Sequence, residues 1–447
     1  MADPAAVEAD MTRVAAGFVG CKVSQADGEE ALAGLAAAGL EPVTTRDAAD
    51  VVVVHTCCVT AEAERKSRRM VRRAASEGKR VVVAGCAAAL RPEQFAGEGI
   101  TVAARPDWAA VAAELAGEGR RPPEAVFPLA TDPDGSSPAA RATPGARTRL
   151  VLKVQDGCAG ACTYCVVRLV RGRPRSVPLT QALAAAREGL DAGCGEVVLS
   201  GIDLGAWRDG AKRLPDLVAA VAELGGLRRV RLSSVEPRHV TPALLELLRH
   251  PRVARHLHVP LQSADDGVLR HMRRPYTRDG YLRAVEGLRD VPGGAMLSTD
   301  VIVGYPTEDE AAFGRTLAAL ESGLFGRVHV FAYSPRPGTA AAELPPLPAA
   351  VVKERMARVL AAAEAAALAA RRAALGREAE VLVEERRDGA WRGYSSEYVR
   401  YALHGRARRG ELVRVVAHEL AGDGVVAYVG AGSRTGGPVV PDGPGEK

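Results

Sequence analysis

The sequence has few aromatic residues and no long hydrophobic run. Only 3 Trp, 9 Tyr and 6 Phe occur among 447 residues, although 47% of the chain is hydrophobic, so Ala, Val and Leu must fill the interior. No stretch approaches the roughly 18 uncharged apolar residues of a membrane span. The first four residues also lack the basic start of a secretory signal. We therefore expect a cytoplasmic protein that does not enter a membrane.

The chain also lacks a strong excess of charge. Lys and Arg number 59 and Asp and Glu 54, which leaves a net charge of +5. A surface that binds anions must therefore be local. Disulfides are rare in the reducing cytosol, so the eight cysteines require another explanation.

Three short apolar runs in the N-terminal third each end at a cysteine. Helical patterns near 29–38 and 62–75 separate these runs, which predicts a parallel α/β domain over residues 10–130. Ligands of open parallel sheets gather at the carboxyl ends of the strands, where we expect these cysteines. The alternative is that they are ordinary buried core residues. The runs are 14–20 before Cys21, 51–54 before Cys57, and 81–85 before Cys86.

The rest of the chain predicts a linker, a larger α/β domain and a small β domain. Residues 131–149 are rich in Pro, Gly, Ser and Arg, as linkers are. Residues 150–375 predict a partial (β/α)6 barrel and a trailing helix, with chemistry at the carboxyl ends of the strands. Residues 376–432 predict a small β-barrel, and 433–447 a flexible tail. The expected barrel strands are 150–154, 196–199, 230–232, 256–259, 296–303 and 327–331.

Cys158, Cys162 and Cys165 form a C-x3-C-x2-C pattern directly after the first expected barrel strand. Three thiolates on one loop suit a [4Fe–4S] cluster with one iron free of protein ligands. A zinc site is the alternative, and it would need a distant fourth ligand. The amino and carboxylate groups of S-adenosylmethionine can chelate an open iron, which places the sulfonium for one-electron cleavage.

This pattern, with Tyr164 before its last cysteine, resembles the radical S-adenosylmethionine (SAM) superfamily. With Cys21, Cys57, Cys86 and the terminal barrel added, residues 10–430 resemble the methylthiotransferases. HTCCVTAEAERKSRRMVRRA and CTYCVVRLVRGRPRSVP are most similar to the group that modifies N6-threonylcarbamoyladenosine in tRNA. The resemblance implies that the N-terminal three cysteines bind a second [4Fe–4S] cluster and that the terminal barrel is an RNA-binding TRAM domain.

Two features depart from the pattern of that family. The family usually has Asn where this chain has His55 and Ser24, and we expect His55 to be a satisfied loop residue instead of a ligand. Cys58 is adjacent to Cys57 and cannot easily point the same way, and Cys194 lies outside any motif. We expect both to be structural, with Cys58 as the alternative to Cys57 as a ligand.

Candidate contacts for the cofactor and for RNA follow from position and charge. Polar residues that close barrel strands suit the methionyl and ribose groups of SAM, although each also suits a cap or turn. They are Ser200, Asp203, Ser233, Glu236, Gln262 and Asp300. Arginines beside the cysteines and in the terminal barrel suit phosphate contacts, although each also suits a solvated surface. They are Arg65, Arg69, Arg73, Arg171, Arg392 and Arg400.

The resemblance implies an enzyme that replaces the C2 hydrogen of N6-threonylcarbamoyladenosine, next to the tRNA anticodon, with a methylthio group. A 5′-deoxyadenosyl radical would remove the hydrogen, the N-terminal cluster would supply sulfur, and a second SAM the methyl group. Radical chemistry suits this step because an aromatic C–H offers no acidic proton.

Other substrates and one other class of protein remain as alternatives. The substrate could be isopentenyl-adenosine in tRNA or an aspartate of a ribosomal protein. In another class, the chain would be an RNA-binding protein whose cysteines hold structural metal. The expected partners of the enzyme are the tRNA anticodon loop and an electron-donor protein such as a flavodoxin, and we expect a monomer.

Overall fold

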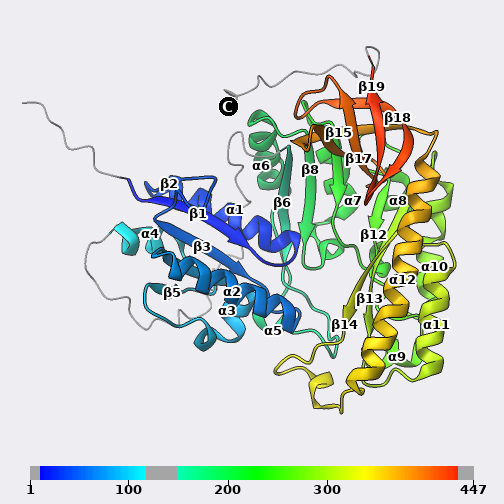
Figure 1. Ribbon diagram of the computed structural model, residues 1–447, viewed down its shortest axis with the longest axis horizontal. Helices are drawn as coiled ribbons and strands as arrows, with labels where there is room; N and C mark the ends of the chain where they lie inside the picture. The colour runs from blue at the N-terminus through cyan, green and yellow to red at the C-terminus, as the bar shows by residue number, and fades with distance from the viewer. Residues whose placement is uncertain (1–10, 117–147, 431–447) are drawn as a thin grey trace, which may run out of the picture. The chain divides into compact units, whose positions relative to one another are not determined.

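The computed structural model describes residues 11–116 and 148–430. The chain divides into two compact units, Met1–Asp134 and Gly135–Lys447 (Figure 1). Nearly all of the expected linker and the whole expected tail lie outside the described residues. No helix of the described ranges combines the length and the apolar character needed to cross a membrane.

The first unit is built on a five-stranded parallel sheet, as the sequence predicts. Its strand order is β2-β1-β3-β4-β5, and every neighbouring pair is parallel. The valine-rich β3 is buried along its whole length, which is typical of a strand that is covered on both faces. The strands are β1 Arg13–Phe18, β2 Glu41–Pro42, β3 Val51–Thr56, β4 Arg80–Gly85 and β5 Ile100–Val102. The helices are α1 Lys22–Ala37, α2 Ala61–Ser76, α3 Cys86–Leu90 and α4 Trp108–Ala116.

The second unit begins with six parallel strands that confirm the predicted partial barrel. They lie in two sheets, of order β11-β8-β6-β7 and β12-β13-β14, and a parallel bridge from Ser234 to His258 connects β11 to β12. The short β7 is antiparallel to β6. The strands are β6 Arg149–Asp156, β7 Arg175–Ser176, β8 Glu196–Gly201, β11 Arg229–Leu232, β12 His256–His258, β13 Met296–Val303 and β14 Arg327–Ala332, with a hairpin of β9 Arg208–Asp209 and β10 Lys212–Arg213.

Helices follow the strands of the partial barrel, and a long helix runs beside β14 (Figure 1). That helix, α12, ends just before Gly376, whose φ of 71° is the left-handed conformation expected of a glycine cap. The helices are α5 Val167–Arg171, α6 Leu179–Asp191, α7 Leu214–Ala222, α8 Pro242–Leu247, α9 Asp266–His271, α10 Arg278–Glu286, α11 Glu310–Glu321 and α12 Ala349–Ala374.

A small closed β-barrel completes the second unit, in the order β15-β16-β17-β19-β18. Short β-branched runs in the sequence predict four of its strands, at 380–384, 398–403, 412–416 and 425–428. They miss β16, in which apolar and polar residues do not alternate over a long enough run. The strands are β15 Glu378–Arg387, β16 Ala390–Ser395, β17 Arg400–Gly405, β18 Leu412–Ala421 and β19 Gly424–Val429.

Two buried arginines of β11, held by a carboxylate of β8, fix the small barrel to the amino ends of the partial barrel's strands. Glu196 on β8 accepts from Arg229 at 2.6 Å and from Arg231 at 2.9 Å. The same guanidiniums donate to the carbonyl oxygens of Tyr394 and Ser395, each at 3.0 Å. The carboxyl ends of the six strands, which we call the rim together with the loops that follow them, are therefore left free of the small barrel.

Candidate active site

The loop that carries Cys158, Cys162 and Cys165, residues 157–166, begins at a position that requires glycine. Gly157 has a φ of 72°, and a Cβ there would lie 2.1 Å from the carbonyl oxygen of Arg173. The Cys158 amide donates to the carbonyl of Gly172 at 3.1 Å. Beneath the loop, Asp156 pairs with Arg171 at 3.2 Å. These contacts hold the first cysteine at the end of β6.

The three cysteines are half-buried and Gly160 leaves space beside them. A Cβ at Gly160 would lie 3.1 Å from Sγ of Cys158 and 3.7 Å from Sγ of Cys162. Burial raises the pKa of the Cys165 thiol to about 12, so a metal must displace its proton on binding. Among the described residues, no three Cys, His, Asp or Glu side chains converge as a single metal ion requires. Ligands of a four-iron cluster bind separate iron atoms and stand further apart.

The far side of the cysteine loop is tied to other parts of the rim. Thr163 Oγ1 donates to the carbonyl of His271 at 2.9 Å and lies 2.8 Å from the Tyr305 hydroxyl. The Thr163 amide donates to the carbonyl of Met272 at 3.1 Å. The loop is therefore braced on both sides.

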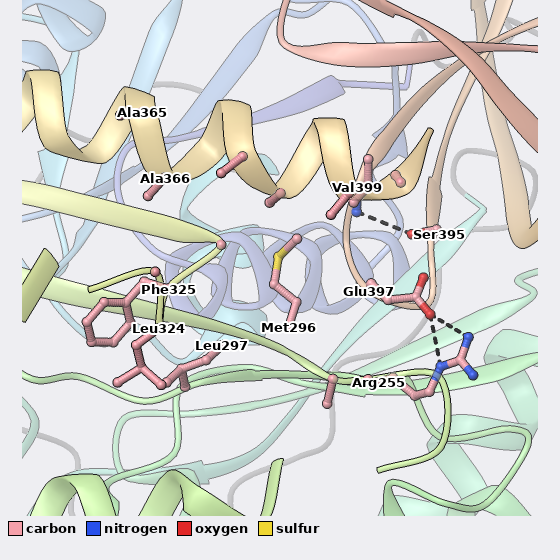
Figure 2. A pocket seen from close by; sticks show the side chains of 18 of the residues that line it. Arg255, Met296, Leu297, Leu324, Phe325, Ala365, Ala366, Ser395, Glu397 and Val399 are labelled. Atoms are coloured by element: carbon pink, nitrogen blue, oxygen red, sulfur yellow. Dashed lines mark hydrogen bonds and ion pairs between the residues drawn. The ribbon is translucent and has the colours of Figure 1, made fainter. Parts of the chain in front are cut away.

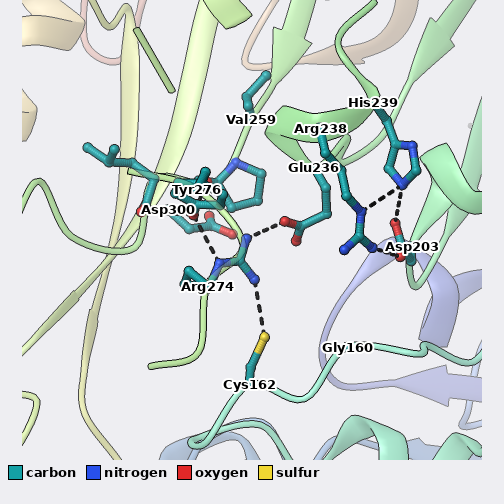
Figure 3. Close-up of polar contacts among 12 residues, drawn as sticks. Gly160, Cys162, Asp203, Glu236, Arg238, His239, Val259, Arg274, Tyr276 and Asp300 are labelled. Carbon is teal, nitrogen blue, oxygen red and sulfur yellow. Dashed lines mark hydrogen bonds and ion pairs between the residues drawn. The ribbon is translucent and has the colours of Figure 1, made fainter. Parts of the chain in front are cut away.

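Arg274 joins the cysteine loop to a carboxylate of the rim (Figure 3). Its Nη1 donates to Sγ of Cys162 at 3.4 Å, its Nη2 pairs with Glu236, and its Nε donates to the Tyr276 hydroxyl at 3.0 Å. The Arg274 side chain is only 5% exposed. Burial raises the pKa of Glu236, although Arg274 opposes that shift. The sequence predicts Glu236 as a site residue but not Arg274.

Some buried polar atoms near the ends of β8 and β11 make no hydrogen bond to the described residues. Ser200 Oγ, Ser233 Oγ and Asp203 Oδ1 are buried and have no hydrogen-bond partner among the described residues. Asp203 Oδ2 lies 3.9 Å from Sγ of Cys158. Unsatisfied buried polar atoms are costly, so a polar ligand is expected to complete them. The three-thiol loop and these atoms together fit a cluster whose free iron is chelated by an amino acid group.

Gln262 and Asp300 lie on the other sheet of the rim. Gln262 has a φ of 64°, and its amide donates to the carbonyl of Asp300 at 2.8 Å. Asp300 lies within β13, where Oδ1 is 3.1 Å from Nε2 of His258. The structure thus brings all six predicted cofactor contacts to the rim, with Glu236 and Asp203 next to the cysteine loop.

The first unit has its own cysteine site at the carboxyl ends of three parallel strands. Cys21 begins α1, Cys57 follows β3, and Cys86 begins α3 directly after β4. A Cβ at Gly20 would lie 2.9 Å from Sγ of Cys57, so the loop that carries Cys21 packs against Cys57. The Cys57 amide is fixed by a hydrogen bond to Ser67 on α2 at 3.2 Å. Three thiols at one sheet edge fit a second cluster.

The three side chains expected to be structural differ in their surroundings. Cys194 packs in the hydrophobic core of the partial barrel, as expected. His55 lies within β3 and not in a loop, so that part of the prediction is wrong; it is buried and its ring lies 5.9 Å from that of Trp108. Cys58, however, is fully buried and hydrogen-bonded to Cys86, so this thiol lies beside the candidate cluster ligands instead of pointing away.

The predicted RNA contacts fall into three groups. Arg65, Arg69 and Arg73 lie on an exposed face of α2, where Glu62 pairs with the first and Glu77 with the last. In the small barrel the two candidates are partly exposed and ion-paired, Arg400 with Asp423 and Arg392 with Asp388. Arg171 is different. It is buried against Asp156 because it braces the cysteine loop, so its guanidinium is not exposed to a nucleic acid.

One cavity of the second unit lies away from the rim, and Figure 2 shows residues that line it. Its volume is about 1050 Å³, and it opens between α12, the start of β13 and the small barrel. Alanines of α12 and apolar side chains such as Met296 and Phe325 line it, while Arg255 pairs with Glu397 at its edge. The volume of a cavity alone therefore does not identify the active site, because this large cavity holds no catalytic groups.

Comparison with known proteins finds family matches in both units. Residues 152–320 match the radical SAM superfamily, and residues 13–104 match an uncharacterized protein family, UPF0004. The threonylcarbamoyladenosine tRNA methylthiotransferase MtaB of Thermotoga maritima is 32% identical over 418 residues, which cover 91% of this chain and 95% of the relative. A tRNA-2-methylthio-N(6)-dimethylallyladenosine synthase of Cereibacter sphaeroides is also 32% identical, over 89% of this chain and 93% of the relative.

A solved structure shares the fold. The radical SAM methyltransferase TsrM from Kitasatospora setae superposes with a TM-score of 0.53 and 15% identity over 74% of this chain and 75% of that one. At this identity the likeness supports the architecture alone.

Proposed function

Because the chain belongs to the radical SAM methylthiotransferases that modify tRNA, we propose that it adds a methylthio group at C2 of N6-threonylcarbamoyladenosine next to the anticodon. One observation carries the chemistry. A braced three-cysteine loop lies at a rim whose buried polar atoms lack partners within the described residues. The family membership excludes the alternative of an RNA-binding protein with purely structural metal.

The radical SAM family uses SAM and a [4Fe–4S] cluster, which together supply a carbon radical able to remove a hydrogen atom from a C–H bond. We assign the cluster to Cys158, Cys162 and Cys165, whose loop is braced by hydrogen bonds on both sides. Glu236 and Asp203 are suited to the charged methionyl end of SAM, because both lie beside the cysteine loop. Ser200, Ser233, Gln262 and Asp300 are suited to the remaining polar groups.

We assign a second [4Fe–4S] cluster, as the sulfur source, to Cys21, Cys57 and Cys86. The position of all three at one edge of the parallel sheet supports this assignment. Arg65, Arg69 and Arg73 on the neighbouring α2 would contact tRNA phosphates, as would Arg392 and Arg400 of the TRAM barrel. We place this reaction in the cytoplasm, with the chain as a monomer and a flavodoxin-like protein as its electron donor.

The substrate is the part of the proposal that most needs a test, because relatives named for threonylcarbamoyladenosine and for dimethylallyladenosine are equally identical to this chain. Nucleoside mass spectrometry of cellular tRNA, with and without this gene, would report substrate and product together. We expect loss of the 2-methylthio form of N6-threonylcarbamoyladenosine and accumulation of its precursor. Loss of the methylthio form of isopentenyl-adenosine instead, or a mass change found only on a ribosomal protein, would contradict the proposal.

A further inference from the structure

A second arginine of the rim, Arg238, is more exposed to solvent than Arg274, and only one edge of its guanidinium makes hydrogen bonds (Figure 3). Its Nη2 donates to Oδ2 of Asp203 at 2.6 Å, and its Nε donates to Nε2 of His239 at 3.0 Å. The Arg238 side chain is 40% exposed, against 5% for Arg274. Its guanidinium therefore has a fixed orientation and still has donors that face solvent.

The surroundings of Arg238 are incomplete without a ligand. Asp203 is 2% exposed, yet its Oδ1 has no hydrogen-bond donor among the described residues. His239 Nε2 is 3.6 Å from that oxygen, but it accepts from Arg238 and so has no proton to offer. The exposed donors of Arg238 therefore suit a ligand that carries a carboxylate, while Asp203 Oδ1 stays available to the amino group of SAM.

Among the described residues, Arg274 and Arg238 are the arginines that contact Glu236 or Asp203 next to the cysteine loop, while SAM brings one carboxylate. Arg274 contacts Sγ of Cys162 and is the inner of the two, so it is the one suited to a cofactor chelated at the cluster. Arg238 then remains for a carboxylate from the RNA. The threonylcarbamoyl group ends in an amino acid with a carboxylate, a hydroxyl and N–H groups, whereas the dimethylallyl group is a hydrocarbon.

Resting on the proposed function, we propose that Arg238 determines substrate specificity by binding the carboxylate of the threonylcarbamoyl group. Asp203 and His239 position its guanidinium for this contact. A dimethylallyl group in the same place would leave the remaining donors of Arg238 without a hydrogen bond and shielded from water. Sites that are built to pair a polar group reject analogues that lack it much more strongly than apolar pockets reject an extra group.

The test measures binding of synthetic anticodon stem-loops to the cluster-loaded, unreduced full-length protein, so that no turnover occurs. The stem-loops carry N6-threonylcarbamoyladenosine, its carboxylate methyl ester or N6-isopentenyladenosine. We expect the unmodified protein to bind the ester about tenfold more weakly than the acid, which is the size of one charge-assisted hydrogen bond. We expect R238Q to bind both equally, and R238K to restore part of the difference.

Two results would overturn the assignment. One is equal binding of acid and ester by the unmodified protein, a comparison that needs no variant to fold. The other is a tenfold loss of SAM affinity in R238Q while its preference for the acid persists, which would assign Arg238 to the cofactor. Failure of the proposed function is visible separately, because reduced protein would then give no methylthio product from the acid stem-loop even if binding discriminates.

Discussion

Nη1 of Arg274 lies 3.4 Å from Sγ of Cys162, although 112 residues separate the two along the chain. A hydrogen bond from a cation to a cluster sulfur stabilises the reduced, more negative state of the cluster. We therefore expect R274Q to lower the reduction potential of the cluster at Cys158, Cys162 and Cys165 by on the order of 60 mV, a tenfold change for a one-electron couple. A redox titration followed by electron paramagnetic resonance would measure it.

Arg270 provides the matched control for that measurement. It lies on α9, is exposed, and belongs to the same stretch of sequence, so R270Q removes a nearby charge without touching the cysteine loop. The reduction potential of the cluster in R270Q should match that of the unmodified protein. An unchanged potential in R274Q, with the iron content intact, would refute a role for this hydrogen bond in tuning the cluster.

The two cysteine sets predict separate losses of iron. With two [4Fe–4S] clusters, the reconstituted protein should hold about eight iron atoms, and removal of either set should leave about four. C158A/C162A/C165A should form no 5′-deoxyadenosine. C21A/C57A/C86A should still form it but yield no methylthio product. Iron and sulfide analysis with quantification of both products would test these expectations.

Cys194 and Cys58 serve as controls for the cysteine sets. C194A changes only the hydrophobic core, so full iron content and activity are expected. C58S removes the thiol that hydrogen-bonds Cys86 and should leave four irons in each site if Cys21, Cys57 and Cys86 are the ligands. A loss of four irons in C58S would instead make Cys58 a ligand.

Gly160 provides a steric test of the cysteine loop. In G160A the new Cβ would lie 3.1 Å from Sγ of Cys158, so one of the two atoms must move. We expect the variant to lose its iron to a chelator several times faster than the unmodified protein, with the overall fold unchanged. G314A is the control, because a Cβ at this glycine of α11 meets no atom within 4 Å and alanine favours the helix. Equal rates of iron loss in G160A and G314A would contradict the expectation.

Arg69 tests the proposed RNA surface of α2. It is exposed and has no ion pair among the described residues, so its charge is available to a phosphate. R69A should weaken the binding of all stem-loops alike and reduce the slope of log affinity against log salt by about one. R289A, an exposed arginine of the second unit, should change neither value. A loss of affinity that depends on the base modification would point to a different role for Arg69.

The sequence predicts the two cysteine sets and the strand ends better than the contacts between them. Cys158 and Glu236 are visible because they directly follow apolar runs, and this local signal survives in the fold. Arg274 is not visible in this way. It follows the short α9 and reaches Cys162 and Glu236 only through tertiary packing, and its sole sequence signal is the HMRRPYT stretch. Arg171 shows the opposite error. The sequence predicts it as an RNA contact because it is charged, but charge alone does not distinguish an arginine buried in an ion pair from one exposed to RNA.

Glu196 predicts how the stability of the second unit depends on pH. Burial alone raises the pKa of this carboxyl, but Arg231 and Arg229 outweigh burial and hold the pKa well below its usual 4.5. Because the folded-state pKa is depressed, the stabilising effect is complete above about pH 4.5 and is lost as the pH falls further. E196Q leaves two buried arginines without a carboxylate, which should cost about 3–5 kcal/mol of unfolding free energy at pH 7.

Chemical unfolding of the full chain at several pH values, followed by tryptophan fluorescence, would measure this cost. The difference in unfolding free energy between the unmodified protein and E196Q should narrow below pH 4.5, because the Glu196 carboxyl of the unfolded chain then takes up a proton while that of the folded chain stays charged. E246Q removes a carboxylate that is 75% exposed beside Arg249, so its effect should stay below about 1 kcal/mol at every pH. If the difference in unfolding free energy between the unmodified protein and E196Q is the same at pH 7 and pH 4, the shape of the Glu196 side chain matters and its charge does not. In that case the small barrel would be held mainly by the carbonyl contacts of Tyr394 and Ser395.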